Sequence, residues 1–92
     1  MVRNKRSFSL NKRLNELIDL LLNIKTERGM EDFLLGILTP KELEEIPTRL
    51  QIVKMLKNGV RHHEIAERLG IGVATVTRGS RELQKGRFKV VN

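Results

Sequence analysis

The chain has 92 residues, of which 39% are hydrophobic and 3% aromatic, and its formal net charge is +7 at pH 7. This length suits one small domain, and the absence of cysteine excludes disulfide scaffolds, thiolate zinc sites and cysteine nucleophiles. No apolar run reaches the roughly 18 residues of a membrane span, and no signal-type segment follows the basic start. We therefore expect a cytoplasmic protein without membrane contact. A single subunit of this size buries only a thin core, so we also expect a partner subunit.

The positive charge gathers at both ends of the chain. Residues 1–13 carry five basic and no acidic side chains, whereas residues 14–60 carry six basic and eight acidic ones. Residues 78–92 again carry five basic side chains, against one acidic one. Basic segments at both ends of a chain whose middle is nearly neutral are typical of a protein that binds a polyanion such as nucleic acid. The alternative is that these charges only keep the surface solvated.

The first half of the chain has the apolar spacing of amphipathic helices. We expect residues 1–8 to form a disordered basic arm, and Ser9 to cap a helix whose apolar residues recur every three or four positions. Gly29 is expected to punctuate the chain before a second, short helix over residues 30–37. Because leucines also lie outside the apolar stripe of the first helix, we expect a second subunit to cover that helix.

A third helix is predicted to begin at Thr39-Pro40. Thr39 can cap the helix, and Pro40 would occupy the first helical position, where no N–H is needed. Apolar residues at helical spacing continue toward Gly59. Pro47 falls inside this segment, which predicts a kink or a break near Ile46.

Residues 62–85 have the pattern of a helix-turn-helix. Gly70 follows the small Ala66 by four positions, where the end of a first helix favours a left-handed glycine. Ile71 is expected to pack in the turn, and Val76, ten positions after Ala66, is expected to be buried by the second helix. The plain alternative is a hairpin of two helices that happens to contain a glycine.

The second of these helices begins with short side chains that would let its backbone approach base edges closely. Thr75 and Thr77 carry hydroxyls for bases or phosphates, and Val73 and Ala74 could touch thymine methyl groups. The predicted DNA-contacting residues are Arg61, His63, Gly72, Val73, Ala74, Thr75 and Thr77.

No alternating strand pattern and no internal repeat is present, so the predicted fold class is all-α.

Adjacent histidines on a helix point about 100° apart, so His62 and His63 do not predict a metal site. No nucleophile has a plausible base, and we expect no enzyme. The predicted parts are a single helical domain over residues 9–92, with a dimerisation core over 9–59, the helix-turn-helix over 62–85 and a basic tail over 86–92.

Three segments closely resemble the Trp repressor family: Leu38-Thr39-Pro40, Thr48-Arg49, and residues 72–80 (GVATVTRGS), which are the most specific. The resemblance spans roughly residues 15–85. It implies an intertwined, all-helical homodimer that represses transcription, in a family well known as an example of helix-turn-helix docking and of water-mediated base contacts. It also implies that L-tryptophan, as corepressor, binds beside the reading helix and orients it for operator DNA.

The resemblance further implies which residues bind the ligand. Arg49 and Arg78 would flank the indole, one from each subunit, and Arg78 would also bind the carboxylate. Guanidinium planes stack on aromatic rings and pair with carboxylates, so these roles are chemically sensible. The carbonyls of Gly36 and Leu38 would accept from the ammonium, and Gly79 would leave room for the ring. The implied ligand-binding residues are Gly36, Leu38, Thr39, Arg49, Arg78, Gly79 and Glu82.

The chain departs from the family pattern at three places. Glu82 stands where the family has a serine that contacts the ligand ammonium, and residues 60–64 are one residue shorter than in the best-known repressors. Before Asn92 there is a basic tail in place of the usual last helix. An orphan relative that binds DNA constitutively, or with another small ligand, is therefore the alternative. A basic helical module for RNA or an acidic protein is a third.

Overall fold

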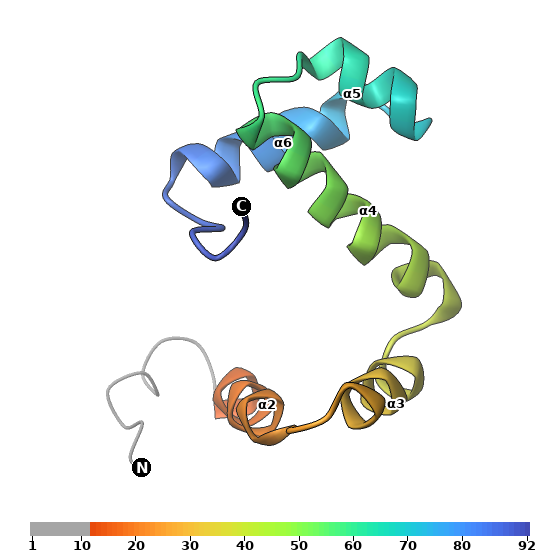
Figure 1. Cartoon of the computed structure of the whole chain (residues 1–92), viewed down its shortest axis with the longest axis vertical. Helices are drawn as coiled ribbons and strands as arrows, with labels where there is room; N and C mark the ends of the chain where they lie inside the picture. The colour runs from red at the N-terminus through yellow and green to blue at the C-terminus, as the bar shows by residue number, and fades with distance from the viewer. Residues whose placement is uncertain (1–11) are drawn as a thin grey trace. The chain divides into compact units, whose positions relative to one another are not determined.

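The computed structural model describes residues 12–92, which contain five helices and no strand (Figure 1). This confirms the predicted all-α class. The predicted arm over residues 1–8 and the Ser9 cap lie outside the part of the chain that is described. The helices are α2 (Lys12–Asn23), α3 (Glu27–Ile37), α4 (Pro40–Lys57), α5 (His62–Leu69) and α6 (Val73–Gln84).

The chain divides into two compact units, Met1–Thr39 and Pro40–Asn92. The described part of the first unit holds α2 and α3, and neither helix contains a buried residue. Several of its large apolar side chains are exposed, most of all Leu22 at 69%. The predicted single domain, and the second subunit expected to cover α2, stay predictions. The other exposed apolar side chains of this unit are Leu14, Leu20, Leu35 and Ile37.

The start of α3 differs from the prediction. Gly29 does not punctuate the chain, because α3 begins at Glu27 and runs through the glycine. Thr26 adopts an extended conformation before the helix, and its hydroxyl oxygen accepts a hydrogen bond of 3.0 Å from the Gly29 N–H. A side-chain cap of this kind satisfies a free N–H of the first turn and outweighs the weak helix propensity of a single glycine.

Helix α4 begins at Pro40, as predicted, but it does not break at Pro47. The helix continues to Lys57 although a proline inside a helix removes one backbone hydrogen bond. The Thr48 hydroxyl donates to the Glu44 carbonyl at 2.9 Å, directly beside the proline. Proline at position 47 leaves the carbonyl four residues earlier, that of Leu43, without its helical donor, and the Thr48 bond goes to the next carbonyl along the helix.

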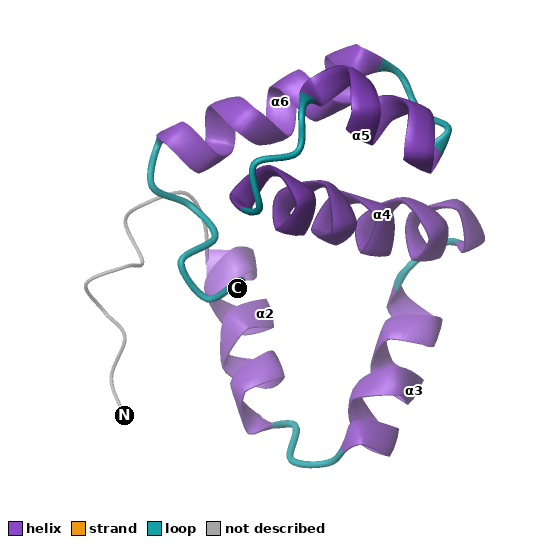
Figure 2. Cartoon of the chain, turned by 45° about the horizontal axis from the view of Figure 1, so that its top comes forward, coloured by secondary structure: helices purple, strands orange, loops and turns teal. Residues whose placement is uncertain are grey.

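In the second unit α4, α5 and α6 pack on one another in pairs (Figures 1 and 2). Their shared core is a cluster of Ile52 from α4, Ile65 and Ala66 from α5, and Val76 from α6, all of them buried. This burial confirms the predicted packing of Ala66 and Val76. The half-buried residues Met55, Leu56, Val60, Leu69 and Ile71 surround the cluster.

A short turn joins α5 to α6. Gly70 has φ 67° and ψ 38°, the left-handed conformation predicted for it. The Gly70 N–H donates to the Glu67 carbonyl (3.3 Å), and the Ile71 N–H donates to the Ala66 carbonyl (3.0 Å). These bonds close the end of α5 and direct the chain into α6. The sequence pattern therefore predicted this turn correctly.

Candidate ligand pocket and nucleic-acid face

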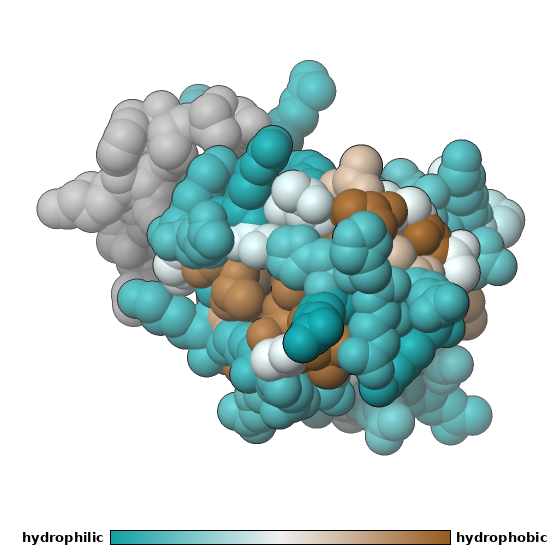
Figure 3. All heavy atoms as spheres, turned by 90° about the horizontal axis from the view of Figure 1, so that it is seen from above, coloured by the Kyte–Doolittle hydropathy of each residue, from teal (hydrophilic) through white to brown (hydrophobic). Residues whose placement is uncertain are grey.

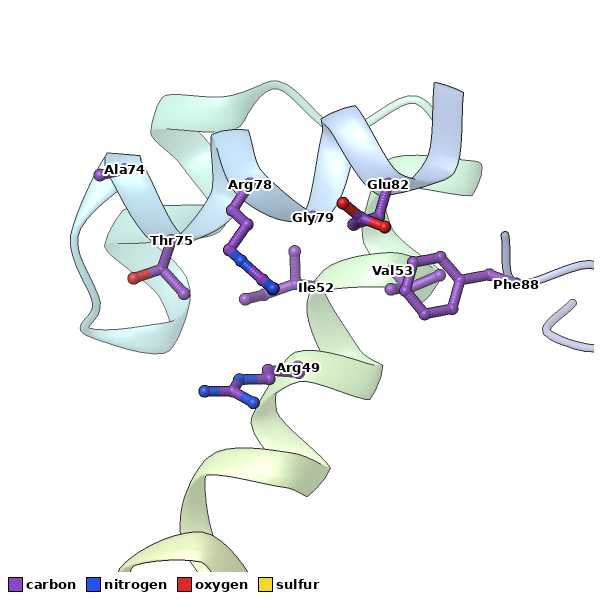
Figure 4. A pocket seen from close by; sticks show the side chains of 9 residues that line it. All are labelled: Arg49, Ile52, Val53, Ala74, Thr75, Arg78, Gly79, Glu82 and Phe88. Atoms are coloured by element: carbon purple, nitrogen blue, oxygen red, sulfur yellow. The ribbon is translucent and has the colours of Figure 1, made fainter. Parts of the chain in front are cut away.

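A cavity of about 530 Å³ lies between α4 and α6 in the second unit (Figure 4). Its volume falls within the range of small-molecule sites, which is roughly 300–1,000 Å³. Apolar side chains and charged side chains both reach it, which is the usual composition of a site that orients a small ligand. The lining residues are Arg49, Ile52, Val53, Ala74, Thr75, Arg78, Gly79, Glu82 and Phe88.

Helix α4 supplies one wall of the pocket. Arg49, Ile52 and Val53 are spaced by three and four positions, so they lie on one face of the helix. Ile52 and Val53 are 2% and 3% exposed, whereas Arg49 is exposed. The wall therefore has a rigid apolar base and an exposed guanidinium above it.

Helix α6 supplies the opposite wall, where Thr75, Arg78, Gly79 and Glu82 recur at spacings of three and four. A Cβ atom at Gly79 would lie 3.3 Å from Cγ2 of Ile52, which is a tight contact. The glycine thus lets α6 lie close to α4, a packing role in addition to the expected role of leaving room for a ligand ring.

Glu82 is the acidic group of the pocket. Lys85 Nζ donates to its Oε2 at 3.1 Å, and Arg87 Nε lies 3.6 Å from its Oε1. The hydrogen bond from Lys85 lowers the pKa of Glu82 below its ordinary value of 4.5, and the positive charges of Lys85, Arg87 and Arg78 act in the same direction against partial desolvation. Glu82 is therefore ionised at neutral pH, and the pocket combines two guanidinium groups with one carboxylate.

Four of the predicted ligand-binding residues line this one pocket: Arg49, Arg78, Gly79 and Glu82. One chain alone brings both arginines to the cavity, whereas the resemblance implies one arginine from each subunit. The other three predicted residues, Gly36, Leu38 and Thr39, belong to the first unit. Gly36 lies in α3, and Leu38 follows its end, where the Leu38 N–H donates to the Leu34 carbonyl at 3.1 Å. The ligand roles of all seven stay predictions.

The sequence analysis assigned two lining residues, Ala74 and Thr75, to DNA contact alone, and it missed three others, Ile52, Val53 and Phe88. Ile52 and Val53 could have been found, because they follow Arg49 by three and four positions on a predicted helix. Phe88 lies beyond the last helix, where no periodicity applies. Only the glycine at position 86 indicated that the chain reverses there.

The predicted DNA-contacting residues surround the start of α5 and α6. Arg61 and His63 are exposed at the start of α5. Gly72, Val73, Ala74 and Thr75 are exposed at the start of α6, and Thr77 is half-buried. Successive helical residues are about 100° apart, so Thr75 and Thr77 lie on different sides of α6. Thr75 lies on the pocket side, and the contact of either threonine with DNA stays a prediction.

An exposed basic stripe runs along α6 and its C-terminal cap. Its members Arg78, Arg81 and Lys85 are spaced by three and four positions and are all exposed. Figure 3 views the molecule from the side of α5 and α6, and hydrophilic side chains cover most of that face. Arg78 belongs both to this stripe and to the pocket, so one residue connects the two surfaces.

Residues 12–92 offer neither a metal site nor a membrane span. No group of three or more His, Cys, Asp or Glu side chains in this part of the chain could hold a metal ion. No helix within the same residues has the length and apolar character needed to cross a membrane.

Comparison with known proteins places the chain among transcriptional regulators. The family model described as "Trp repressor protein" matches residues 12–90. A "Trp operon repressor homolog" of Photobacterium profundum is 43% identical over 70 residues, which cover 75% of this chain and 68% of that protein. A protein of the same description from Vibrio vulnificus is 34% identical over 70 residues, 75% of this chain and 69% of that protein. No solved structure is significantly similar to the chain.

Proposed function

The chain belongs to the Trp repressor family, whose members are regulators and not enzymes, and we propose that it represses transcription by binding operator DNA as a homodimer with L-tryptophan as corepressor. Family membership supports repression directly. The operator, the dimer and the corepressor are the parts of the proposal that need experiments. Repression of a bacterial operon, as in the named relatives, would place the protein in the cytoplasm.

The charge pattern of the pocket is the observation that carries the corepressor assignment. Arg49 and Arg78 offer two guanidinium groups, and Glu82 offers one carboxylate, around the apolar base of Ile52 and Val53. An aromatic amino acid carries a carboxylate, an ammonium group and a flat apolar ring, which match these three features. The residues present therefore fit L-tryptophan.

In this proposal Arg78 pairs with the ligand carboxylate and stacks on the indole, while Arg49 covers the other face of the ring. Glu82 accepts from the ligand ammonium in place of the family's serine. Its ionised state, favoured by Lys85 and Arg87, keeps it an acceptor at neutral pH.

Arg78 also supplies the means by which the ligand acts on DNA binding. The residue lines the pocket and belongs to the exposed basic stripe of α6. A ligand that holds the Arg78 side chain, and braces α6 against α4, would reduce the freedom of the helix that enters the major groove. Ligand and operator would then each raise the affinity for the other by the same factor.

Binding of L-tryptophan to the purified protein tests the corepressor. The chain contains no Trp and no Tyr, so the ligand supplies the tryptophan fluorescence. A ligand at about 100 times its Kd stabilises the fold it binds by about 2.7 kcal/mol, which raises the melting temperature clearly. Arg78→Ala and Arg49→Ala should abolish the rise in melting temperature. Arg81→Ala should keep it, because Arg81 lies on α6 like Arg78 but outside the pocket.

Operator binding tests the rest of the proposal. Duplexes selected from a random pool by the protein with L-tryptophan should be bound with two-fold symmetry. Arg49→Ala should remove the response to L-tryptophan and leave the basal DNA affinity nearly unchanged, because Arg49 lies outside α5 and α6. If millimolar L-tryptophan changes neither the melting temperature nor the DNA affinity, the chain is an orphan regulator, the alternative raised by the departures from the family pattern at Glu82 and residues 60–64. If RNA or an acidic protein binds and no duplex does, the third interpretation holds.

A further inference from the structure

Residues 86–92, which we call the strap, follow α6 and turn back toward the pocket. Gly86 has φ 95°, a conformation that side chains with a Cβ rarely adopt, and its N–H donates to the Leu83 carbonyl at 3.0 Å. The next N–H, that of Arg87, donates to the Glu82 carbonyl at 3.2 Å. This pair of bonds around a left-handed glycine is a Schellman end, which fixes the direction in which the chain leaves the helix.

Helix α4 holds the strap in place. Nζ of Lys57, the last residue of α4, donates to the Phe88 carbonyl at 2.6 Å and also to the Val91 carbonyl. The Val91 N–H donates to the Phe88 carbonyl at 3.1 Å, which closes a turn within the strap. Phe88 itself has φ 66°, which is rare for a bulky residue and persists only where neighbouring contacts fix it.

These contacts bring the Phe88 side chain to the pocket. Phe88 is half-buried, and Figure 4 shows its ring beside Val53 and below Glu82, at the end of the pocket away from Ala74 and Thr75. A cavity of about 530 Å³ remains with the ring in this position. The ring therefore bounds the pocket without filling it.

We propose that Phe88 is a ligand-contacting wall of this pocket that selects an aromatic side chain, and that Lys57 is its positioning residue, because Lys57 holds the Phe88 backbone and not the ligand. The inference rests on the proposed function, since it assumes that the pocket takes an aromatic amino acid. An aromatic wall favours a second ring over an aliphatic group of similar size, through edge-to-face or offset contact.

The test is a titration of the full chain and its variants with L-tryptophan, followed by ligand fluorescence. Phe88→Ala should bind L-tryptophan about two- to tenfold more weakly, the range expected for loss of one ring–ring contact. The emission maximum of bound L-tryptophan should shift toward its value in water. L-leucine, measured by competition, should lose less affinity than L-tryptophan, because a general loss of structure would weaken both equally.

Matched variants distinguish the loss of the Phe88 contact with the ligand from a general effect on folding. Val90→Ala, in the same strap but at a 92% exposed residue, should bind like the wild type. Lys57→Met should weaken L-tryptophan binding in the same direction as Phe88→Ala, and Lys57→Arg should restore it, because arginine can also donate to two carbonyls. Lys54→Met, one turn earlier on α4, should have no effect.

The outcomes also separate this inference from the proposed function. If the wild type and Phe88→Ala bind L-tryptophan equally well, Phe88 does not contact the ligand. The proposal that L-tryptophan is the corepressor then still holds. Equal losses of affinity for L-tryptophan and L-leucine in Phe88→Ala also overturn the selective role of Phe88. Equal effects of Lys57→Met and Lys54→Met overturn the positioning role of Lys57. If the wild type does not bind L-tryptophan, both proposals fail. If Phe88→Ala does not fold, Phe88→Leu is used in its place, because leucine keeps most of the bulk and lacks the ring. This variant should show the same loss of selectivity for L-tryptophan over L-leucine.

Discussion

The two units of this chain both consist of helices in their described parts but differ in what those helices bury. All five residues that the structure shows as buried and hydrophobic, Ile52, Val53, Ile65, Ala66 and Val76, belong to the second unit. In the first unit, α2 and α3 bury none, and Leu22 is 69% exposed. Apolar spacing alone therefore does not tell whether a helix is covered by its own chain.

The difference lies in what each helix can pack against. In the second unit a glycine turn after α5 and a glycine within α6 let three helices meet closely around small and β-branched residues. The described part of the first unit has two helices with leucine on more than one side. Exposed apolar patches of this kind are typical of surfaces that a partner covers, which agrees with the proposed homodimer.

Removal of a core side chain from the second unit should have the largest effect. Ile65 is 0% exposed, and Ile65→Ala should lower the free energy of unfolding by about 2–5 kcal/mol, because the substitution removes buried methyl groups and leaves a cavity. Urea unfolding followed by circular dichroism measures the change. A loss below about 1 kcal/mol would contradict a stabilising core at this position.

Truncation of an exposed leucine in the first unit should show whether a partner subunit covers it. If a partner subunit covers Leu22, Leu22→Ala should cost about 1.5–3 kcal/mol at a fixed protein concentration, and sedimentation should detect dissociation at higher concentrations than for the wild type. Val90→Ala, at another exposed apolar residue, serves as the control. A change within about 0.5 kcal/mol for Leu22→Ala would mean that this side chain stays in water.

The glycine turn of the second unit can be tested without any change in packing. A Cβ at Gly70 would meet no atom within 4 Å, so Gly70→Ala should act only through its left-handed backbone and cost about 1–2 kcal/mol. Gly72→Ala is the matched control, because Gly72 has φ −76° and equally open space around it. Equal thermal stability of the two variants would show that the turn tolerates a side chain.

The smallest expected effect concerns the half-buried carboxylate of the pocket, Glu82. Because the folded-state pKa of Glu82 lies below its ordinary value of 4.5, its contribution to stability is present above that value and is lost as the pH falls through the lowered pKa. The melting temperature of the wild type should thus fall slightly more between pH 6 and about pH 3 than that of Glu82→Gln. Parallel pH profiles of the two proteins would contradict this role of Lys85 and its neighbours.

The sequence by itself determined the local structure and the family. Spacing of apolar residues predicted an all-helical chain, and Gly70 and Pro40 marked helix ends correctly, because these signals depend on backbone geometry within a few residues. Three short segments, of which residues 72–80 are the most specific, indicated the family. The same local reasoning failed at Gly29, where the Thr26 cap supports a helix that glycine weakens. Near Pro47 the helix does not break, and the kink stays a prediction.

Only the tertiary structure decided which side chains meet. The resemblance implied one ligand site for Arg49 and Glu82, but only the structure shows that they share a pocket within one chain, because α6 crosses close to α4 at Gly79. The place of Phe88 depends on a left-handed turn and on Lys57, which lies 31 residues away in the sequence. Contacts over such separations follow from the packing of whole helices and from loop direction, and no periodicity within one segment encodes them.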